Sequence, residues 1–258
     1  MYYPIQIPYI LNQAFSQKMR YEETSAAECG GFVICFWEMH PLSDREMSVE
    51  NVIAADACID IVAGYDEKKI GFAGMRKTNF HFIAELPARF IGARLMPGAF
   101  HQLTGLPAAA AMDTFLPLES VYEDFDQSLL FSLPFEKSKE YLRKFIFGKT
   151  RHQTPDLFTA LFDTLSENAP SDTKELYQML NFSPRQCQRL FAKHYGITPK
   201  MALSIVRFQK CLEILTSPKA RPTDILNITG YYDQPHFIKD FKRNIGITPM
   251  ELIRMYQP

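Results

Sequence analysis

Hydrophobic positions between residues 30 and 97 occur in short runs, each bounded by Gly, Pro, Asp or a polar pair. Short apolar runs at this spacing are typical of the strands of an all-β barrel or sandwich. A short helix is predicted at 98–105. The predicted strands lie in 31–39, 50–56, 58–65, 69–74, 79–86 and 89–96.

The pattern changes at Pro134, where two segments place apolar residues on one helical face. An amphipathic helix needs a cover for that face, which either its own domain or a second copy of the chain would supply. The pattern leaves both alternatives open. The apolar positions are Tyr141, Leu142, Phe145 and Ile146 in the first segment, and Leu157, Phe158, Leu161, Phe162 and Leu165 in the second.

From residue 171 onward the chain is predicted to be helical. A short helix around Leu176 is followed by a helix with Ser183 as N-cap, Pro184 at its first position and Gln186 placed for a capping box. Gly196 is suited to end that helix. A long helix from about 199 to 216 follows.

A second cycle repeats the first at an offset of 50 residues, and "GITP" occurs in both. It predicts a short helix at 223–228, a turn at Gly230, a helix capped by Asp233 and ended by Gly246, and a further capping box at "TPME". Each cycle therefore predicts a helix-turn-helix unit.

The polar faces of the two second helices carry side chains suited to DNA. Arg bonds guanine and Gln bonds adenine in the major groove, and we predict base contacts for Arg185, Gln188 and Arg189. In the second copy the corresponding region holds Gln234, Pro235, His236, Ile238 and Lys239. Because Ile suits thymine methyl groups or shape fitting, we expect the first copy to supply more of the specificity. Phosphate contacts are predicted for Lys193, Lys200, Lys242 and Arg243.

The long helix explains why the unit is duplicated. At 1.5 Å per residue, residues 199–216 span roughly 27 Å, whereas successive major-groove faces lie about 34 Å apart. One connecting helix would hold both recognition helices on one side of the duplex, slightly too close together, so that either the DNA bends or one helix engages poorly.

Charge and composition sharpen this picture. The 258 residues suffice for two domains. The net charge of −1 divides into −7 for residues 1–170, with 15 Lys or Arg and 22 Asp or Glu, and +6 for residues 171–258, with 13 and 7. The basic C-terminal third thus favours an anionic partner. Five cysteines without C-x-x-C spacing predict reduced, buried thiols, and the lack of long apolar runs predicts a cytoplasmic protein.

The segments "SPRQCQRLFAKHYGITP" and "GYYDQPHFIKDFKRNIGITPMELIR" resemble the two helix-turn-helix units of the AraC/XylS family of bacterial transcription regulators. The resemblance covers about residues 171–256 and implies that both recognition helices enter adjacent major grooves. Three positions depart from it: Cys187 replaces a larger aliphatic, Pro235 a polar residue, and Asp240 stands where the first copy has Leu190.

Residues 1–122 resemble, less specifically, an uncharacterised cupin-like domain found in front of such modules. We therefore predict an α+β protein: a β-rich sensor or dimerisation domain at 1–122, a helical connector at 123–170 and a tandem helix-turn-helix domain at 171–258. The expected partners are double-stranded DNA, a small-molecule effector, RNA polymerase and a second copy of the chain, with no membrane partner.

The aromatics Phe36, Trp37, Phe72, Phe80 and Phe82 are candidates for an effector pocket, although such residues more often form core. Metal catalysis is disfavoured, because His40, His81, Glu85 and His101 show no H-x-H pair with a following carboxylate. No cofactor and no enzymatic activity are predicted. The alternative to effector-controlled regulation is a small-molecule-binding protein that the module tethers to DNA without coupling.

Overall fold

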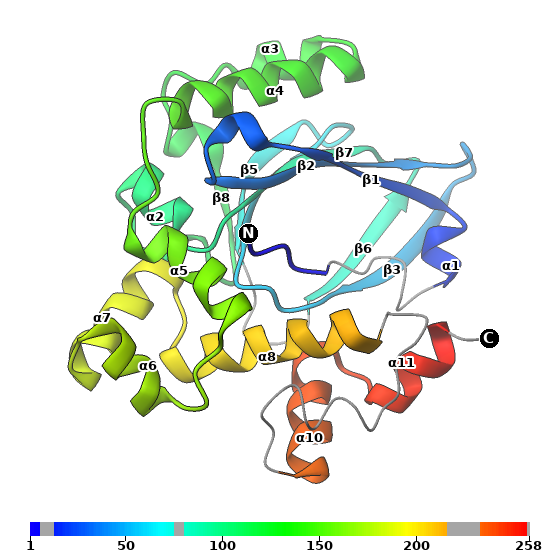
Figure 1. The fold of residues 1–258 in the computed structure, drawn as a ribbon. Helices are drawn as coiled ribbons and strands as arrows, with labels where there is room; N and C mark the ends of the chain where they lie inside the picture. Colours follow the sequence, from blue (N-terminus) through cyan, green and yellow to red (C-terminus); the bar gives the residue numbers. More distant parts are fainter. Residues whose placement is uncertain (6–12, 75–79, 216–232, 257–258) are drawn as a thin grey trace.

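The computed structural model describes residues 1–5, 13–74, 80–215 and 233–256. Two antiparallel sheets form the N-terminal domain (Figure 1). The larger sheet has the strand order β1-β2-β7-β4-β5-β8, and the smaller one pairs β3 with β6. The strands are β1 (Met19–Ser25), β2 (Val33–Pro41), β3 (Met47–Ile53), β4 (Ile59–Gly64), β5 (Lys69–Gly74), β6 (Phe80–Leu86), β7 (Phe90–Leu95) and β8 (Phe115–Pro117).

Each predicted strand segment overlaps an observed strand, and helix α2 (Ala99–Thr104) forms within 98–105, so the predicted α+β class with a β-rich N-terminal domain is confirmed. β3 ends at Ile53, however, and residues 54–57 form a connection to β4. The pattern missed β1 and β8, which are the two edges of the larger sheet. β1, with the sequence MRYEETS, is too polar to stand out as a strand, and β8 has only three residues.

The larger sheet carries different chemistry on its two faces. Side chains alternate along a strand, and one face is apolar and packs against helices. On that face Phe72 meets Phe100 of α2 at 4.9 Å between ring centroids. The Arg143 guanidinium of α4 (Phe135–Thr150) lies 5.0 Å from the centre of the Phe36 ring. The other face carries Arg94, which pairs in register with Cys35 on β2 and Asp60 on β4.

The connector helices α3 (Gln127–Ser132), α4 and α5 (Leu157–Glu167) lie against the rest of the chain (Figure 1). In α4, Leu142 and Ile146 are buried, and in α5 so are Phe158, Leu161, Phe162 and Leu165. Lys139 of α4 forms an ion pair with Glu38 at 2.6 Å. Most of both apolar faces is therefore covered within the chain, with Leu157 as an exposed exception, which leaves little of them free for the dimer contact considered above.

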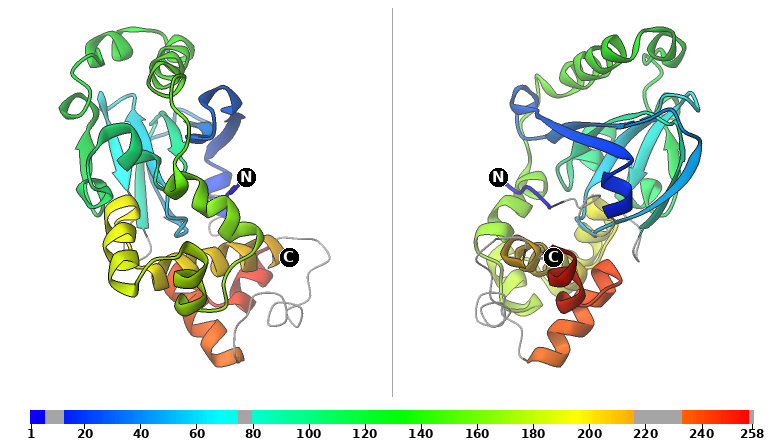
Figure 2. Two further views of the ribbon diagram at one scale, coloured as in Figure 1. Left: turned by 60° about the vertical axis from the view of Figure 1, so that its left-hand side comes forward. Right: turned by 90° about the vertical axis from the view of Figure 1, so that its right-hand side faces the viewer.

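The C-terminal third contains helices α6 (Thr173–Leu180), α7 (Pro184–Tyr195), α8 (Pro199–Leu215), α10 (Gln234–Ile245) and α11 (Pro249–Tyr256). The predicted helix at 223–228 and turn at Gly230 lie outside the described residues. α7 lies beside α2, whereas α10 lies on the side of α8 away from the strands (Figures 1 and 2). The first helix-turn-helix unit thus contacts the β domain more extensively than the second unit does.

The buried residues follow the same division. Phe191, Tyr195 and Ile197 of the first unit belong to one continuous core with the β domain. Phe208, Phe237, Phe241, Ile245 and Leu252 form a second core around α8, α10 and α11, which also includes Ala54 of the β domain.

Candidate nucleic-acid interface

Helix α7 begins and ends as the sequence predicts. The Ser183 hydroxyl accepts a hydrogen bond from the Gln186 N–H at 3.3 Å, and the Gln186 Oε1 accepts one from the Ser183 N–H at 2.9 Å, which completes the capping box. Gly196 ends the helix with φ +69°, in the left-handed region. The same geometry recurs at α10, where Asp233 accepts from the His236 N–H at 2.8 Å and Gly246 has φ +85°. Local sequence therefore fixes both recognition helices.

α7 presents its predicted base-contacting side chains to solvent. Cys187 and Phe191 are fully buried, and Leu190 is half-buried against the core. Arg185, Gln188 and Arg189 all lie on the opposite, exposed face. The first unit thus has two basic side chains and one amide grouped on a helix held from behind, an arrangement suited to bases in a major groove.

α10 differs in one respect from the expectation. Phe237 and Phe241 are buried, and Gln234, Pro235, His236 and Lys239 are exposed. Ile238 is half-buried and packs against the second core, so it does not stand fully outward as predicted. To contact a thymine methyl, the Ile238 side chain would therefore have to pack against the second core and touch DNA at the same time.

The predicted phosphate contacts are of two kinds. Lys193, Lys200 and Lys242 are exposed, whereas the Arg243 Nη1 pairs with the Asp240 carboxylate at 2.8 Å. Asp240 is buried and accepts a hydrogen bond from the Ser204 hydroxyl of α8 at 2.7 Å. Asp240 therefore has a structural role in joining α10 to α8, and it offsets part of the charge of Arg243.

The contact at Ser204 also corrects the expected spacing. α10 meets α8 at Ser204 and at Phe208, whose ring lies 5.2 Å from that of Phe241. Both residues precede the C-terminal end of α8 at Leu215. The length of α8 is consequently not the distance between the recognition helices, as the sequence argument assumed, because α10 crosses α8 part-way along it.

Of the aromatic side chains proposed for an effector pocket, Phe36 and Phe72 lie on one face of the larger sheet and Trp37 on the other. Phe36 and Phe72 belong to the helix-covered face of the larger sheet, as their contacts with Arg143 and Phe100 show. Trp37 follows Phe36 in β2 and points to the other face, where its indole N–H donates to Asp60 at 2.9 Å. The side chains of Phe80 and Phe82 lie outside the described part of the structure. Strand alternation separates neighbours that composition alone suggested as partners.

That other face holds a group of charged residues that the sequence argument missed, called here the Arg94 cluster: Arg94, Glu23, Asp56, Asp60 and Tyr21. Arg94 is 4% exposed and donates to Glu23 at 2.9 Å and to the Tyr21 hydroxyl at 3.1 Å. Its Nε lies 3.8 Å from Asp56 and 3.7 Å from Asp60. The sequence signal for the Arg94 cluster is an arginine in the otherwise apolar strand FIGARL.

Burial and mutual charge shift the titration of this cluster. Burial raises the pKa of Asp60 to about 7, with Arg94 opposing the shift. For Glu23, burial also opposes ionisation, but Arg94 and two tyrosine hydroxyls hold the pKa below its usual value. The β domain thus contains two carboxyls with opposite shifts beside one buried cation.

The thiols have the environment predicted for structural cysteines. All five are buried, and burial raises the pKa of the Cys35 thiol to about 12. A thiol with a raised pKa has little thiolate at neutral pH. The Cys35 environment therefore agrees with the reduced, buried thiols that the sequence predicts.

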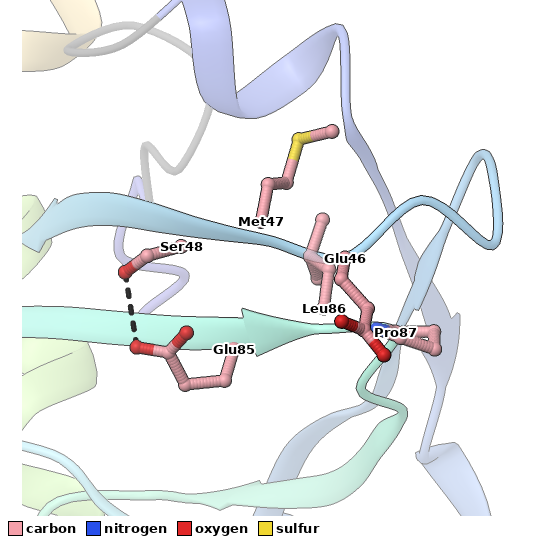
Figure 3. Close-up of a pocket in the computed structure, with 6 residues that line it drawn as sticks. All are labelled: Glu46, Met47, Ser48, Glu85, Leu86 and Pro87. Atoms are coloured by element: carbon pink, nitrogen blue, oxygen red, sulfur yellow. Dashed lines mark hydrogen bonds between the residues drawn. The ribbon is translucent and has the colours of Figure 1, made fainter.

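A hollow of about 470 Å³ lies at the end of the smaller sheet, and Figure 3 shows its lining by Glu46, Met47, Ser48, Glu85, Leu86 and Pro87. Within it the Ser48 hydroxyl donates a hydrogen bond to the Glu85 carboxylate at 3.0 Å. Phe36, Trp37 and Phe72, the pocket candidates whose side chains the structure describes, do not line it. Across the described residues, no group of three or more His, Cys, Asp or Glu side chains is arranged to hold a metal ion, and no described helix has the length and apolarity to span a bilayer.

Two sequence families match the chain: a helix-turn-helix domain over residues 176–255 and a domain of unknown function, DUF6597, over residues 26–117. The HTH-type transcriptional regulator GbdR of Pseudomonas aeruginosa is 25% identical over 108 residues, which cover 42% of this chain and 29% of GbdR. Residues 176–255 therefore form a helix-turn-helix domain of the AraC type. The first match runs from α6 to α11, and the second lies within the predicted uncharacterised N-terminal domain.

Among solved structures, the chain is similar to ToxT from Vibrio cholerae, with a TM-score of 0.43 and 10% identity over 93% of this chain and 100% of that one. A structure of ToxT with bound unsaturated fatty acid gives a TM-score of 0.42 and 10% identity, covering 93% of this chain and 95% of that one.

Proposed function

We propose that this protein is a sequence-specific DNA-binding transcription regulator of the AraC/XylS family that contacts two adjacent major grooves. The observation that carries the proposal is the exposed group of Arg185, Gln188 and Arg189 on α7, a helix whose opposite face is buried. The match of residues 176–255 to a helix-turn-helix domain and the net charge of +6 over residues 171–258 support the same function.

The two helices have unequal roles in this proposal. α7 supplies most of the base contacts, because its three candidates are fully outward. α10 contacts DNA through Gln234, His236 and Lys239, with Pro235 and part of Ile238 contributing shape. Lys193, Lys200 and Lys242 bind phosphates, and Arg243 contributes less because Asp240 pairs with it.

The β domain controls this module in our proposal, through a small effector or through contact with a second copy of the chain, and RNA polymerase is a further expected partner. Control of this kind requires that the effector bind two arrangements of the protein with different affinity. The protein requires no cofactor and acts in the cytoplasm, where its DNA target lies.

Substitution of Arg189 tests base contact directly. After selection of a bound site from random DNA, Arg189→Ala is expected to lose about 1 to 3 kcal/mol of binding free energy on that site and to relax the preference at one base pair. The control is Lys242→Ala, which should weaken selected and random DNA alike, because a phosphate contact carries no sequence information. Equal losses of Arg189→Ala on both DNAs would contradict the proposal.

A further inference from the structure

Residues 54–57, which connect β3 to β4, lie between the β domain and the second helix-turn-helix unit. Ala54 is 2% exposed and belongs to the same buried cluster as Phe208 of α8 and Phe241 of α10. A residue of the β domain thus contributes to the core of the second unit, whose remaining members come from the C-terminal third and from Ile5, which packs against it.

Gln209 of α8 joins this segment to the N-terminal residues. Its amide group donates to the Ala55 carbonyl at 2.9 Å, and its Oε1 accepts from the Ile5 N–H at 2.8 Å. The Ala55 N–H in turn lies 3.5 Å from the Asn244 carbonyl of α10. Gln209 is 6% exposed, so its loss would leave two backbone groups without these partners in a buried setting.

The other end of the segment enters the Arg94 cluster. The Asp56 carboxylate accepts from the Cys58 N–H at 2.9 Å and lies 3.8 Å from the Arg94 Nε, and the Asp56 carbonyl accepts from the Tyr2 hydroxyl at 2.9 Å. Ala57 has φ +64°, a left-handed conformation that is unfavourable for a residue with a Cβ. A strained backbone persists where surrounding contacts determine it from several sides.

The first unit is attached to the β domain by different contacts. Phe191, Tyr195 and Ile197 belong to the β-domain core, and the Tyr195 hydroxyl donates to the Phe158 carbonyl at 2.6 Å. The first half of α8 also belongs to that core, through Leu203 and Val206. A shift of residues 54–57 would therefore act on the second half of α8 and on α10 while these contacts still hold α7. The two recognition helices would change their relative position.

We infer that residues 54–57 and Gln209 position α10 relative to α7, and that changes in the Arg94 cluster reach α10 through Asp56. The inference rests on the proposed function, since it assigns to the β domain a role in placing the second recognition helix. Gln209 is then a positioning residue: it acts through Ala55 and Asn244 and itself contacts no DNA.

Gln209→Leu tests the positioning role on three DNAs: the selected site, the same site with the bases under α10 scrambled, and the site with those under α7 scrambled. We expect the preference for the intact over the α10-scrambled site to fall about three- to tenfold, and the α7 preference to stay unchanged. The matched control is Gln102→Leu, which removes a comparable amide bridge from α2 to Thr154 and Asp156. It should alter neither preference. An equal change of both preferences, or none, for Gln209→Leu would overturn the inference.

Hydrogen exchange without DNA tests the link to the Arg94 cluster. Glu23→Gln keeps the side-chain shape but weakens the bond to Arg94, and we expect exchange of the α10 amides to quicken about tenfold, as in Gln209→Leu and unlike Gln102→Leu. Faster exchange confined to β1, β2 and β7 would refute the link through Asp56. Failure of the proposed function would give a different result, because the wild-type protein itself would then show no preference among the three DNAs.

Discussion

At the scale of single residues, His194 shows how burial at the domain junction acts on a titratable group. Its ring stacks on Phe158 of α5 with centroids 4.0 Å apart and meets His101 of α2 edge-on at 4.6 Å. Burial, and then the neighbouring His101, lower the pKa of His194 to about 4, while Asp156 opposes the shift and Lys193 adds to it. The folded protein thus holds this imidazole neutral between the β domain and a recognition helix.

The stability of the protein should consequently fall on acidification through this residue. Unfolded His titrates near pH 6.5, so below that pH the unfolded chain takes up a proton that the folded chain refuses. The contribution of His194 to the free energy of unfolding is on the order of 2 to 3 kcal/mol. It is complete above about pH 6.5, declines as the pH falls, and is lost at about pH 4. Urea denaturation of the wild type and of His194→Phe from pH 4 to 7.5 checks this, since the wild type should lose stability relative to the variant as the pH falls. A constant difference would show that His194 does not carry this pH dependence.

At the scale of helices, the two "GITP" copies place glycine where each recognition helix must stop. Gly196 has a second constraint, because a Cβ there would lie 2.7 Å from the Met112 side chain of the β domain. Gly105 ends α2 with a similar φ of +74°, but nothing lies within 4 Å of its Cβ position. Substitutions at Gly196 and Gly105 can therefore separate the cost of backbone strain from the cost of a packing clash.

We expect Gly105→Ala to cost about 1 kcal/mol of unfolding free energy, from the left-handed backbone alone. Gly196→Ala should cost about 2 to 3 kcal/mol, since Met112 must also move in a packed interior. Chemical denaturation of both variants gives the comparison. Equal losses would mean that Met112 adapts without cost.

The elements also show what the sequence can and cannot determine. The caps at Ser183 and Asp233 depend on residues three positions away, so pattern analysis finds them. The Arg94 cluster joins Glu23, Asp56 and Asp60 from separate strands and connections, and the strand order β1-β2-β7-β4 brings them together only in the folded sheet. The same reasoning applies to Phe36 and Trp37, which adjoin in sequence but lie on opposite faces of the sheet.

At the scale of the whole molecule, charge is separated along the chain, with −7 over residues 1–170 and +6 over residues 171–258. DNA binding releases counterions in proportion to the phosphates that the protein neutralises, so the logarithm of affinity falls linearly with the logarithm of salt concentration. The slope counts effective charges, and a cation already paired within the protein adds less to it than a free one.

Lys242 and Arg243 are adjacent on α10 and differ in this pairing, since the Arg243 guanidinium lies 2.8 Å from Asp240 and remains 59% exposed. We expect Lys242→Ala to flatten the salt slope by about 1 and Arg243→Ala to flatten it by clearly less. Titrations of each variant on random DNA at several salt concentrations give both slopes without reference to base contacts. If both variants flattened the slope equally, the ion pair between Arg243 and Asp240 would have to break when DNA binds. Arg243 would then pair with a phosphate instead of the Asp240 carboxylate.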